Sequence, residues 1–402
     1  MRQTLPNSLR QSLHPLLIAL LALAMFNYPQ DVLTSASAGV SLWWKFVLPA
    51  LLPFFILSEL LIGAGFVHFL GVLLEPLMRP LFHLPGKAAF VVAMGYTSGF
   101  PMGAVLTARL RQDREITQEE GERLLTFTNN PSPGFIFGAV ASGLLGKPEL
   151  GILLALSVYL ANLLVGILFR FYGSNLTVRE KPQTSLRKAW RALLSAQAKD
   201  DRPFGLIFGQ AIRQSVTTVI TVGGYIVFFS VALRVLTLWH ITALLANALH
   251  LILGAFLPLA NLKALLDGLL EMTLGCQGVV AASSNLNAQI AGLAFVMGWG
   301  GFSVFAQIAG FTAETDLRIS PYILGRVIHA FLSLGLSELM LRFAHIPTFS
   351  QSPIPTGFNP GPATTPELWL NTLHLSTWMF IGTISTFLLL LVVGKVLAFR
   401  RR

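Results

Sequence analysis

The sequence predicts an all-α polytopic membrane protein, with about eight transmembrane helices and two re-entrant hairpins arranged as two inverted repeats with broken helices. Three observations predict this class. Hydrophobic residues make up 54% of the 402 residues and charged residues only 11%, against about 25% in soluble domains. The basic residues gather in short loops and at the termini, as the positive-inside rule requires. Clusters containing Gly, together with Pro and Asn in the first half, interrupt the apolar runs twice in each half, in the same order.

The composition also narrows the function. The net charge of +10 is compatible with a nucleic-acid partner, but its distribution indicates membrane topology, so we expect a lipid bilayer and no nucleic acid. A single cysteine, Cys276, excludes an internal disulfide framework. The eight histidines show no metal-ligand spacing, so we expect no metal, no cofactor and no catalytic residue. An intramembrane enzyme using Cys276 or Ser132 is the alternative, but neither has a base nearby in sequence.

The N-terminal region, residues 1–39, contains one apolar segment, Leu13–Tyr28, preceded by Arg2 and Arg10. Ala36-Ser37-Ala38 resembles a cleavage site, so a removable signal peptide remains an alternative. The gap between the apolar segment and that site is long for a signal peptide, which favours a retained first span. The following segment has no Lys or Arg and is expected outside.

Residues 40–172 form the first predicted repeat. It contains a span, an interfacial helix, a hairpin with its tip at Gly95–Gly103, a broken span and a final span. The charged segment Arg109–Arg123 is expected to be a solvated cytoplasmic helix start, capped by Thr117. Glu59 is expected to pair with Lys45 or with a residue elsewhere in the scaffold. In order, the five segments are Val40–Gly65, Phe66–Leu84, Ala88–Leu110, Leu124–Leu145 and Leu150–Tyr172.

Residues 173–203 form a basic linker that is expected inside and that divides the protein in two. Residues 204–345 then repeat the earlier features with opposite orientation, and the second hairpin enters from outside. Residues 346–402 comprise an outside Pro-rich loop, a last span and a cytoplasmic C-terminus. The segments of this second part are Phe204–Leu236, Trp239–Leu262 (interfacial, or another span), the hairpin with its tip at Thr273–Gly278, Ile290–Phe311, Tyr322–Phe343, Pro347–Pro366, Trp369–Phe399 and Arg400–Arg402.

The interruptions predict a polar site. In hydrocarbon a broken backbone is tolerated only where it is buried in protein or lines a wet cavity, and its free amides suit an anionic or polar ligand. A proline kink at the first broken span, or tight packing of the glycines, is the structural alternative. The candidate substrate-binding residues are Thr97, Ser98, Gly99, Gly103, Asn129, Asn130, Ser132, Thr273, Gly275, Gly298 and Gly300.

Glu271 is an acidic residue inside an apolar run, and it is the candidate for coupling to Na⁺ or H⁺, with a structural brace as the alternative. Arg213, Arg326 and His329 also interrupt apolar segments. Each lies near enough to the end of its predicted span that we expect it to snorkel rather than to line an anion path.

Several of these motifs, taken together, resemble the YlbJ-type sporulation integral membrane proteins, part of a wider group with nucleoside-recognition (Gate) domains related to concentrative nucleoside transporters and spore maturation proteins. The resemblance extends from about Lys45 to about Phe343 and implies that both repeats are Gate-like. It rests on Thr97–Ala104, Glu119–Leu125, Asn129–Asn130 and Glu271–Cys276.

The resemblance implies alternating-access transport of a small polar or anionic solute, namely translocation of dipicolinic acid across the outer forespore membrane of a sporulating bacterium. A nucleoside-type transporter is one alternative. A structural or recruitment subunit of a sporulation membrane complex, docking through the basic linker, is another. A homo-oligomer is compatible with each of these functions.

Overall fold

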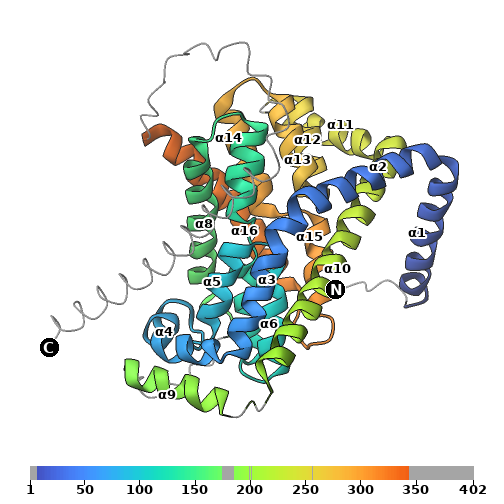
Figure 1. Cartoon of the computed structure of the whole chain (residues 1–402). Helices are drawn as coiled ribbons and strands as arrows, with labels where there is room; N and C mark the ends of the chain where they lie inside the picture. Colours follow the sequence, from blue (N-terminus) through green and yellow to red (C-terminus); the bar gives the residue numbers. More distant parts are fainter. Residues whose placement is uncertain (1–6, 174–184, 199, 201, 256, 344–402) are drawn as a thin grey trace, which may run out of the picture.

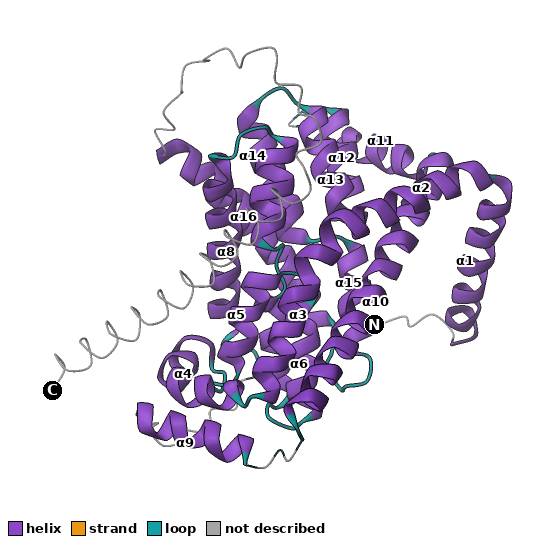
Figure 2. Cartoon of the chain, viewed as in Figure 1, coloured by secondary structure: helices purple, strands orange, loops and turns teal. Residues whose placement is uncertain are grey.

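The computed structural model describes residues 7–343 apart from 174–184, 199, 201 and 256, and every regular element in these residues is a helix (Figures 1 and 2). The expectations for the Pro-rich loop, the last span and the basic C-terminus therefore lie outside the described residues. The helices form one elongated bundle, from which α1 (Asn7–Asn27) projects to one side (Figure 1). α2 (Pro29–Leu42) connects α1 to the bundle, and its Asp31 pairs with Arg234 at 2.5 Å.

The first half of the bundle follows the predicted order of segments. A helix bends sharply at Ala64–Gly65, and two pairs of short helices and one long helix follow. The bend of 84° turns α4 away from α3. The elements are the π-helical segment η1 (Trp43–Val47), α3 (Leu48–Gly63), α4 (Phe66–Phe82), α5 (Ala88–Ser98), α6 (Met102–Gln112), α7 (Gln118–Thr128), the π-helical segment η2 (Gly134–Leu144) and α8 (Leu150–Phe169).

The second half has the same order of elements: a long helix, a short helix, two pairs of short helices and a long helix. Because α12 begins at Leu259, the predicted segment Trp239–Leu262 shortens to the helix α11. The elements are α10 (Phe204–Leu238), α11 (Ile241–Leu253), α12 (Leu259–Leu270), α13 (Met272–Ala282), α14 (Leu286–Trp299), α15 (Phe302–Thr312) and α16 (Ser320–Phe343).

Between the halves, α9 (Leu186–Gln197) represents the basic linker in the described structure. Ser185 caps its N-terminus by accepting a hydrogen bond from the Lys188 N–H at 3.2 Å. α9 packs on α4, where the ring of Trp190 meets the edge of Phe69 with centroids 6.4 Å apart. α4 and α9 lie together at one end of the bundle, whereas α11 lies at the other end (Figure 1).

Among the described residues, four helices are long and apolar enough to cross a membrane, or up to five if the bent pair α3–α4 counts as one. The four are α8, α10, the interrupted pair α14–α15, and α16. The chain is thus an integral membrane protein.

Each half contains a pair of short helices that folds back on itself. In the first half, Gly95 on α5 and Gly103 on α6 both lie against the backbone oxygen of Thr128, so the two helices flank the same point. In the second half, a Cβ atom added to Gly275 of α13 would lie 2.1 Å from the Cα of Gly268 on α12. Gly95 and Gly103 therefore allow the first helical pair to pack closely on α7, and Gly268 and Gly275 allow the second pair to close tightly.

Candidate functional site

The described structure contains breaks between consecutive helices at four positions that bear on the site, and local backbone chemistry explains each. α5 ends at Gly99, whose φ of 84° is unfavourable for residues with a side chain. α7 ends at Asn129, just before Pro131 and Pro133, which cannot donate backbone hydrogen bonds. α12 and α13 are separated by Glu271 in extended conformation. α14 ends at Gly300, whose φ is 90°.

The second hairpin differs from its prediction. The expected tip, Thr273–Gly278, lies within α13, and the helices are broken at Glu271 instead. Gly275 faces α12 rather than a tip, because it is needed for close packing between the two helices. The other breaks fall inside their predicted clusters.

The four breaks touch one another. A Cβ atom added to Gly99 would lie 2.6 Å from the backbone nitrogen of Ser132, so the first break packs against the second. A Cβ atom added to Gly300 would lie 3.2 Å from the ring of Phe100. At the neighbouring Gly301, the added atom would lie 3.3 Å from the Cα of Glu271. The interrupted backbone of both halves therefore meets in one continuous region.

Asn129 holds the first two breaks together. Its Oδ1 accepts a hydrogen bond from the Ala104 N–H at 3.0 Å, and its Nδ2 donates to the Leu125 oxygen at 3.0 Å. The first of these bonds gives a second acceptor to an amide in the opening turn of α6, which also donates to the oxygen of the N-cap residue Pro101 at 2.9 Å. The Asn129 side chain is thus fully used in the described structure.

Arg326 of α16 lies at the centre of this region and is fully buried. Its Nη1 donates to the Asn129 oxygen at 2.7 Å, its Nε to the Trp299 oxygen at 3.0 Å and its Nη2 to the Met297 oxygen at 3.0 Å. Its guanidinium carbon also lies 5.4 Å from the ring centroid of Phe100. One side chain therefore links the ends of α7 and α14 with the first hairpin.

The expectation that Arg326 and His329 snorkel to the membrane surface is wrong. Both are fully buried. For Arg326, the breaks in α7 and α14 expose the carbonyl oxygens that a buried cation needs, whereas His329 lies with its Nε2 2.8 Å from the Val158 oxygen of α8. Arg213, in contrast, is exposed on α10. A sequence signal for the buried face exists: polar residues recur every three or four positions along one side of α16, all fully buried. They are Tyr322, Arg326, His329, Ser333 and Ser337.

Several buried polar groups on α16 and at the first two breaks lack a hydrogen-bond partner within the described structure. Both amide atoms of Asn130 are among them, although the Tyr96 hydroxyl lies beside this side chain. The hydroxyl oxygens of Ser98, Tyr322 and Ser333 are also unpaired and buried. Because an unpaired buried polar group costs free energy, these groups are candidates for contact with water or a polar solute.

Glu271 lies on the other side of the same region and is 6% exposed. Its carboxylate accepts a hydrogen bond from the Leu274 N–H at 2.8 Å and caps α13, with Thr273 beside it. Within the described residues, Glu271 has no cationic partner in an ion pair, and no group of three or more His, Cys, Asp or Glu side chains is placed to hold a metal ion.

The remaining candidate residues make local contacts. The Thr97 hydroxyl donates to the Ala93 oxygen at 2.9 Å, inside its own helix. Ser132 accepts a hydrogen bond from the Phe135 N–H at 3.2 Å. A Cβ atom added to Gly298 would lie 2.8 Å from the Cα of Ala330, so Gly298 allows α14 and α16 to approach closely. The structure thus brings Asn129 and Gly300 into contact with Arg326, packs Gly99 against Ser132, and places Thr273 with Glu271. Ser98 and Asn130 are the sequence neighbours of Gly99 and Asn129 at the first two breaks.

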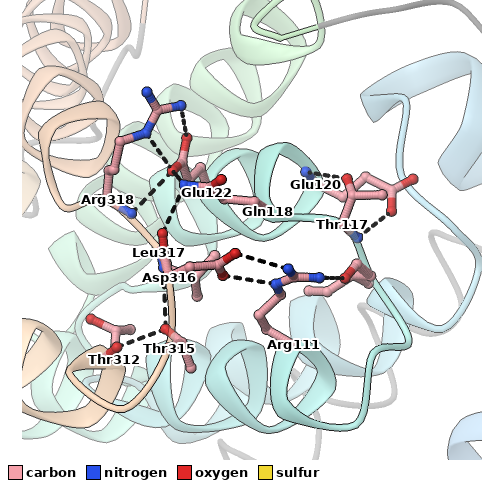
Figure 3. A network of polar contacts seen from close by, with 11 residues as sticks. Arg111, Thr117, Gln118, Glu120, Glu122, Thr312, Thr315, Asp316, Leu317 and Arg318 are labelled. Carbon is pink, nitrogen blue, oxygen red and sulfur yellow. Dashed lines mark hydrogen bonds and ion pairs between the residues drawn. The ribbon is translucent and has the colours of Figure 1, made fainter.

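A second polar network joins the two halves near the α6–α7 and α15–α16 connections (Figure 3). Arg111 binds Asp316 through two hydrogen bonds of 2.8 Å, and Gln118 donates to the Asp316 backbone oxygen at 2.7 Å. Glu122 accepts hydrogen bonds from Arg318 and from the Tyr172 hydroxyl.

The charged segment Arg109–Arg123 is therefore only partly as predicted. Thr117 caps α7 and forms a reciprocal capping box with Glu120. However, Glu122 is fully buried rather than solvated, because residues from the other half cover it. Arg109, at the start of the segment, pairs with Glu59 of α3, which gives that carboxylate a scaffold partner.

The electrostatics of this network follow from its hydrogen bonds. Burial alone would raise the pKa of Glu122, but the hydrogen bonds from Arg318 and Tyr172 outweigh it and lower the pKa. The Arg111 guanidinium likewise lowers the pKa of Asp316. Both carboxylates are thus held in the ionised form at neutral pH.

These features define the class of protein: an all-helical integral membrane protein whose broken helices meet at a buried polar centre.

A family model described as nucleoside recognition (Gate) matches residues 44–175, which contain α3 to α8. The chain is 46% identical over 314 residues to the sporulation integral membrane protein YlbJ of Bacillus subtilis (strain 168), and the alignment covers 77% of each protein. The chain belongs to the YlbJ family of sporulation integral membrane proteins, which confirms the resemblance. No solved structure matches it.

Proposed function

We propose that this protein transports a small polar or anionic solute by alternating access, with the solute bound where the four helix breaks meet. The observation that carries this proposal is the set of unpaired, buried polar groups beside the breaks, above all the Asn130 amide and the Ser98 hydroxyl. A purely structural kink would have its polar groups paired within the protein, because unpaired ones are costly. A bound solute would satisfy them.

The repeated order of elements supports two inverted repeats. Each half contains a folded-back helical pair followed by a broken helix, and the short helices α4 and α11 lie at opposite ends of the bundle (Figure 1). In transporters of this type, two such halves reach the middle of the bilayer from opposite sides and alternate access to a common site. The two hairpins would then be re-entrant. The predicted total of eight spans includes Trp369–Phe399, which lies outside the described residues.

The solute that we propose first is dipicolinate, moved across the outer forespore membrane during spore formation. The support is membership of a family whose curated relative is named a sporulation integral membrane protein. A dicarboxylate also suits a centre that contains a buried arginine and half-helix ends. Glu271 is the proposed site for the coupling ion, Na⁺ or H⁺, because it is a buried carboxylate at the third break.

The test is reconstitution of the full-length protein in liposomes, followed by uptake of radiolabelled dipicolinate and nucleosides under an inward gradient of Na⁺ or H⁺. Uptake above that of empty liposomes, reduced by Asn130→Ala, is expected. Folded, monodisperse protein that moves neither class of solute would overturn the transport proposal.

A nucleoside is the second candidate solute, because the nucleoside-recognition model matches the half that contains Asn130. The same uptake assay separates the two solutes by cross-competition. A recruitment role in a sporulation membrane complex would instead predict that deletion of α9 abolishes the sporulation phenotype while uptake by the purified protein is unchanged.

A further inference from the structure

The charge of Arg326 is not balanced by an acidic side chain. Arg326 is fully buried, and in the described part of the chain it makes no ion pair with Asp or Glu. Its three hydrogen bonds all end on backbone carbonyl oxygens, of Asn129, Trp299 and Met297. Partial charges therefore stabilise a full positive charge in a region from which water is largely excluded.

These carbonyl oxygens are available because α7 and α14 are broken. The last carbonyl groups of a helix have no partner within it, and they form the negative end of the helix dipole. Asn129 follows the last residue of α7, whereas Met297 and Trp299 lie in the last turn of α14. The breaks thus create the acceptors that hold the arginine in place.

The guanidinium group retains donors for a ligand. A guanidinium has five N–H donors, and three of those of Arg326 are used in the described hydrogen bonds. The ring of Phe100 lies over one face of the group, which leaves the edge for further polar contacts. The unpaired polar groups of Asn130, Ser98 and Tyr322 lie on elements that contact Arg326 or flank the same breaks.

We infer that Arg326 makes the site selective for negatively charged solutes. The site then accepts a carboxylate or a similar small anion, which pairs with the free N–H groups of Arg326. This inference rests on the proposed transport function and deepens it, because it assigns the anion preference to one residue. Asn130 and Ser98 then provide neutral hydrogen bonds to the rest of the solute. Glu271, at the third break, caps α13 and forms no ion pair with Arg326 in the described structure.

The experiment compares two probes of the same shape, pyridine-2,6-dicarboxylate and its neutral diamide, binding to the full-length protein in nanodiscs at pH 7 by isothermal titration calorimetry. The wild-type protein is expected to prefer the dicarboxylate by about thirtyfold or more, which is the range for loss of a buried charge pair. Arg326→Met should reduce this preference to about one, and Arg326→Lys should keep part of it. Arg213→Met, on the exposed surface of α10, is the matched control and should change nothing.

Folding of each variant is checked by size-exclusion chromatography. If Arg326→Met does not fold, the wild-type preference alone decides, because equal binding of the diamide and the dicarboxylate would overturn the inference. So would an undiminished preference in folded Arg326→Met, or wild-type protein that does not bind the dicarboxylate at millimolar concentration.

The outcome is separable from that of the transport proposal. Arg326-dependent binding of the dicarboxylate without liposome flux would overturn transport and leave the anion site intact. Flux that is equal for charged and neutral solutes, and unaffected in Arg326→Met, would leave transport intact and overturn the role of Arg326.

Discussion

Glu122 accepts three hydrogen bonds from Arg318: from its backbone N–H at 3.0 Å, from Nε at 2.8 Å and from Nη2 at 2.9 Å (Figure 3). Glu122 belongs to α7 in the first half, whereas Arg318 precedes α16 in the second. The bond therefore fixes the two halves to each other away from the central site. Under the proposed function, a change of access must either break the contact between Glu122 and Arg318 or move both residues together.

Removing Arg318 should destabilise the protein more than removing Arg111. Arg318→Ala leaves the fully buried Glu122 without its main donor, whereas Arg111→Ala leaves Asp316, which is 50% exposed and can be solvated. Thermal unfolding in detergent should show the larger fall in Tm for Arg318→Ala. The double variant Glu122→Ala/Arg318→Ala should recover part of that loss, and purely additive losses would contradict the coupling.

The Glu122 network should also make stability depend on pH in the acid range. The pKa of Glu122 in the folded protein is below its ordinary value of 4.5, so its stabilising effect is present above that pH and is lost as the pH falls through the folded pKa. The Tm difference between the wild type and Glu122→Gln should be largest near neutral pH and should shrink below about pH 4. A constant difference between pH 7 and pH 3 would contradict this assignment. Asp316→Asn is the comparison, because Arg111 shifts the pKa of Asp316 in the same direction.

Neighbouring asparagines should behave differently when replaced. Asn129→Ala removes two hydrogen bonds at a fully buried position, so it should lower stability by about 1–3 kcal/mol as well as impair uptake. Asn130→Ala removes an amide that forms no hydrogen bond of normal geometry, although the Tyr96 hydroxyl lies beside it, so stability should fall less than in Asn129→Ala while uptake falls by about tenfold, the value of one hydrogen bond to the solute. Uptake and Tm measured on the same preparations check both. Equal losses of stability would favour a structural kink at this break.

Gly275→Ala should prevent the second hairpin from closing. The new methyl group would lie 2.1 Å from the Cα of Gly268, a clash that costs at least about 1–3 kcal/mol by overpacking. Gly224→Ala on α10 is the matched control, because no heavy atom lies within 4 Å of the added Cβ. Yield of monodisperse protein and its Tm report the difference. Normal folding of Gly275→Ala would show that the hairpin has room that the structure does not give it.

The sequence cues predicted the order of helices and three of the four breaks, because Gly and Pro act locally on the backbone. They misplaced the break in the second hairpin. Gly275 and Gly278 indicated a tip, but glycine also serves close helix packing, and only the fold shows which role applies. The break lies at Glu271 in an extended conformation with φ of −142°, which any residue can adopt.

The central role of Arg326 was harder to predict. The polar face of α16 was visible in the spacing of Tyr322, Arg326 and His329, but a charge near a span end normally reaches water. Its acceptors come from Asn129 and Trp299, which are distant in sequence and exposed only because their helices end there. A local pattern cannot show acceptors that the tertiary fold supplies.

The missing counter-charge beside Arg326 has an electrical consequence. A membrane potential acts on a charge that moves across the bilayer with about 2.3 kcal/mol per 100 mV. If the centre shifts between the two faces, Arg326 moves its positive charge with it when the site is empty, whereas pairing with a dicarboxylate makes the charge of the pair negative. Through Arg326, the membrane voltage would then act in opposite directions on the empty and the loaded steps.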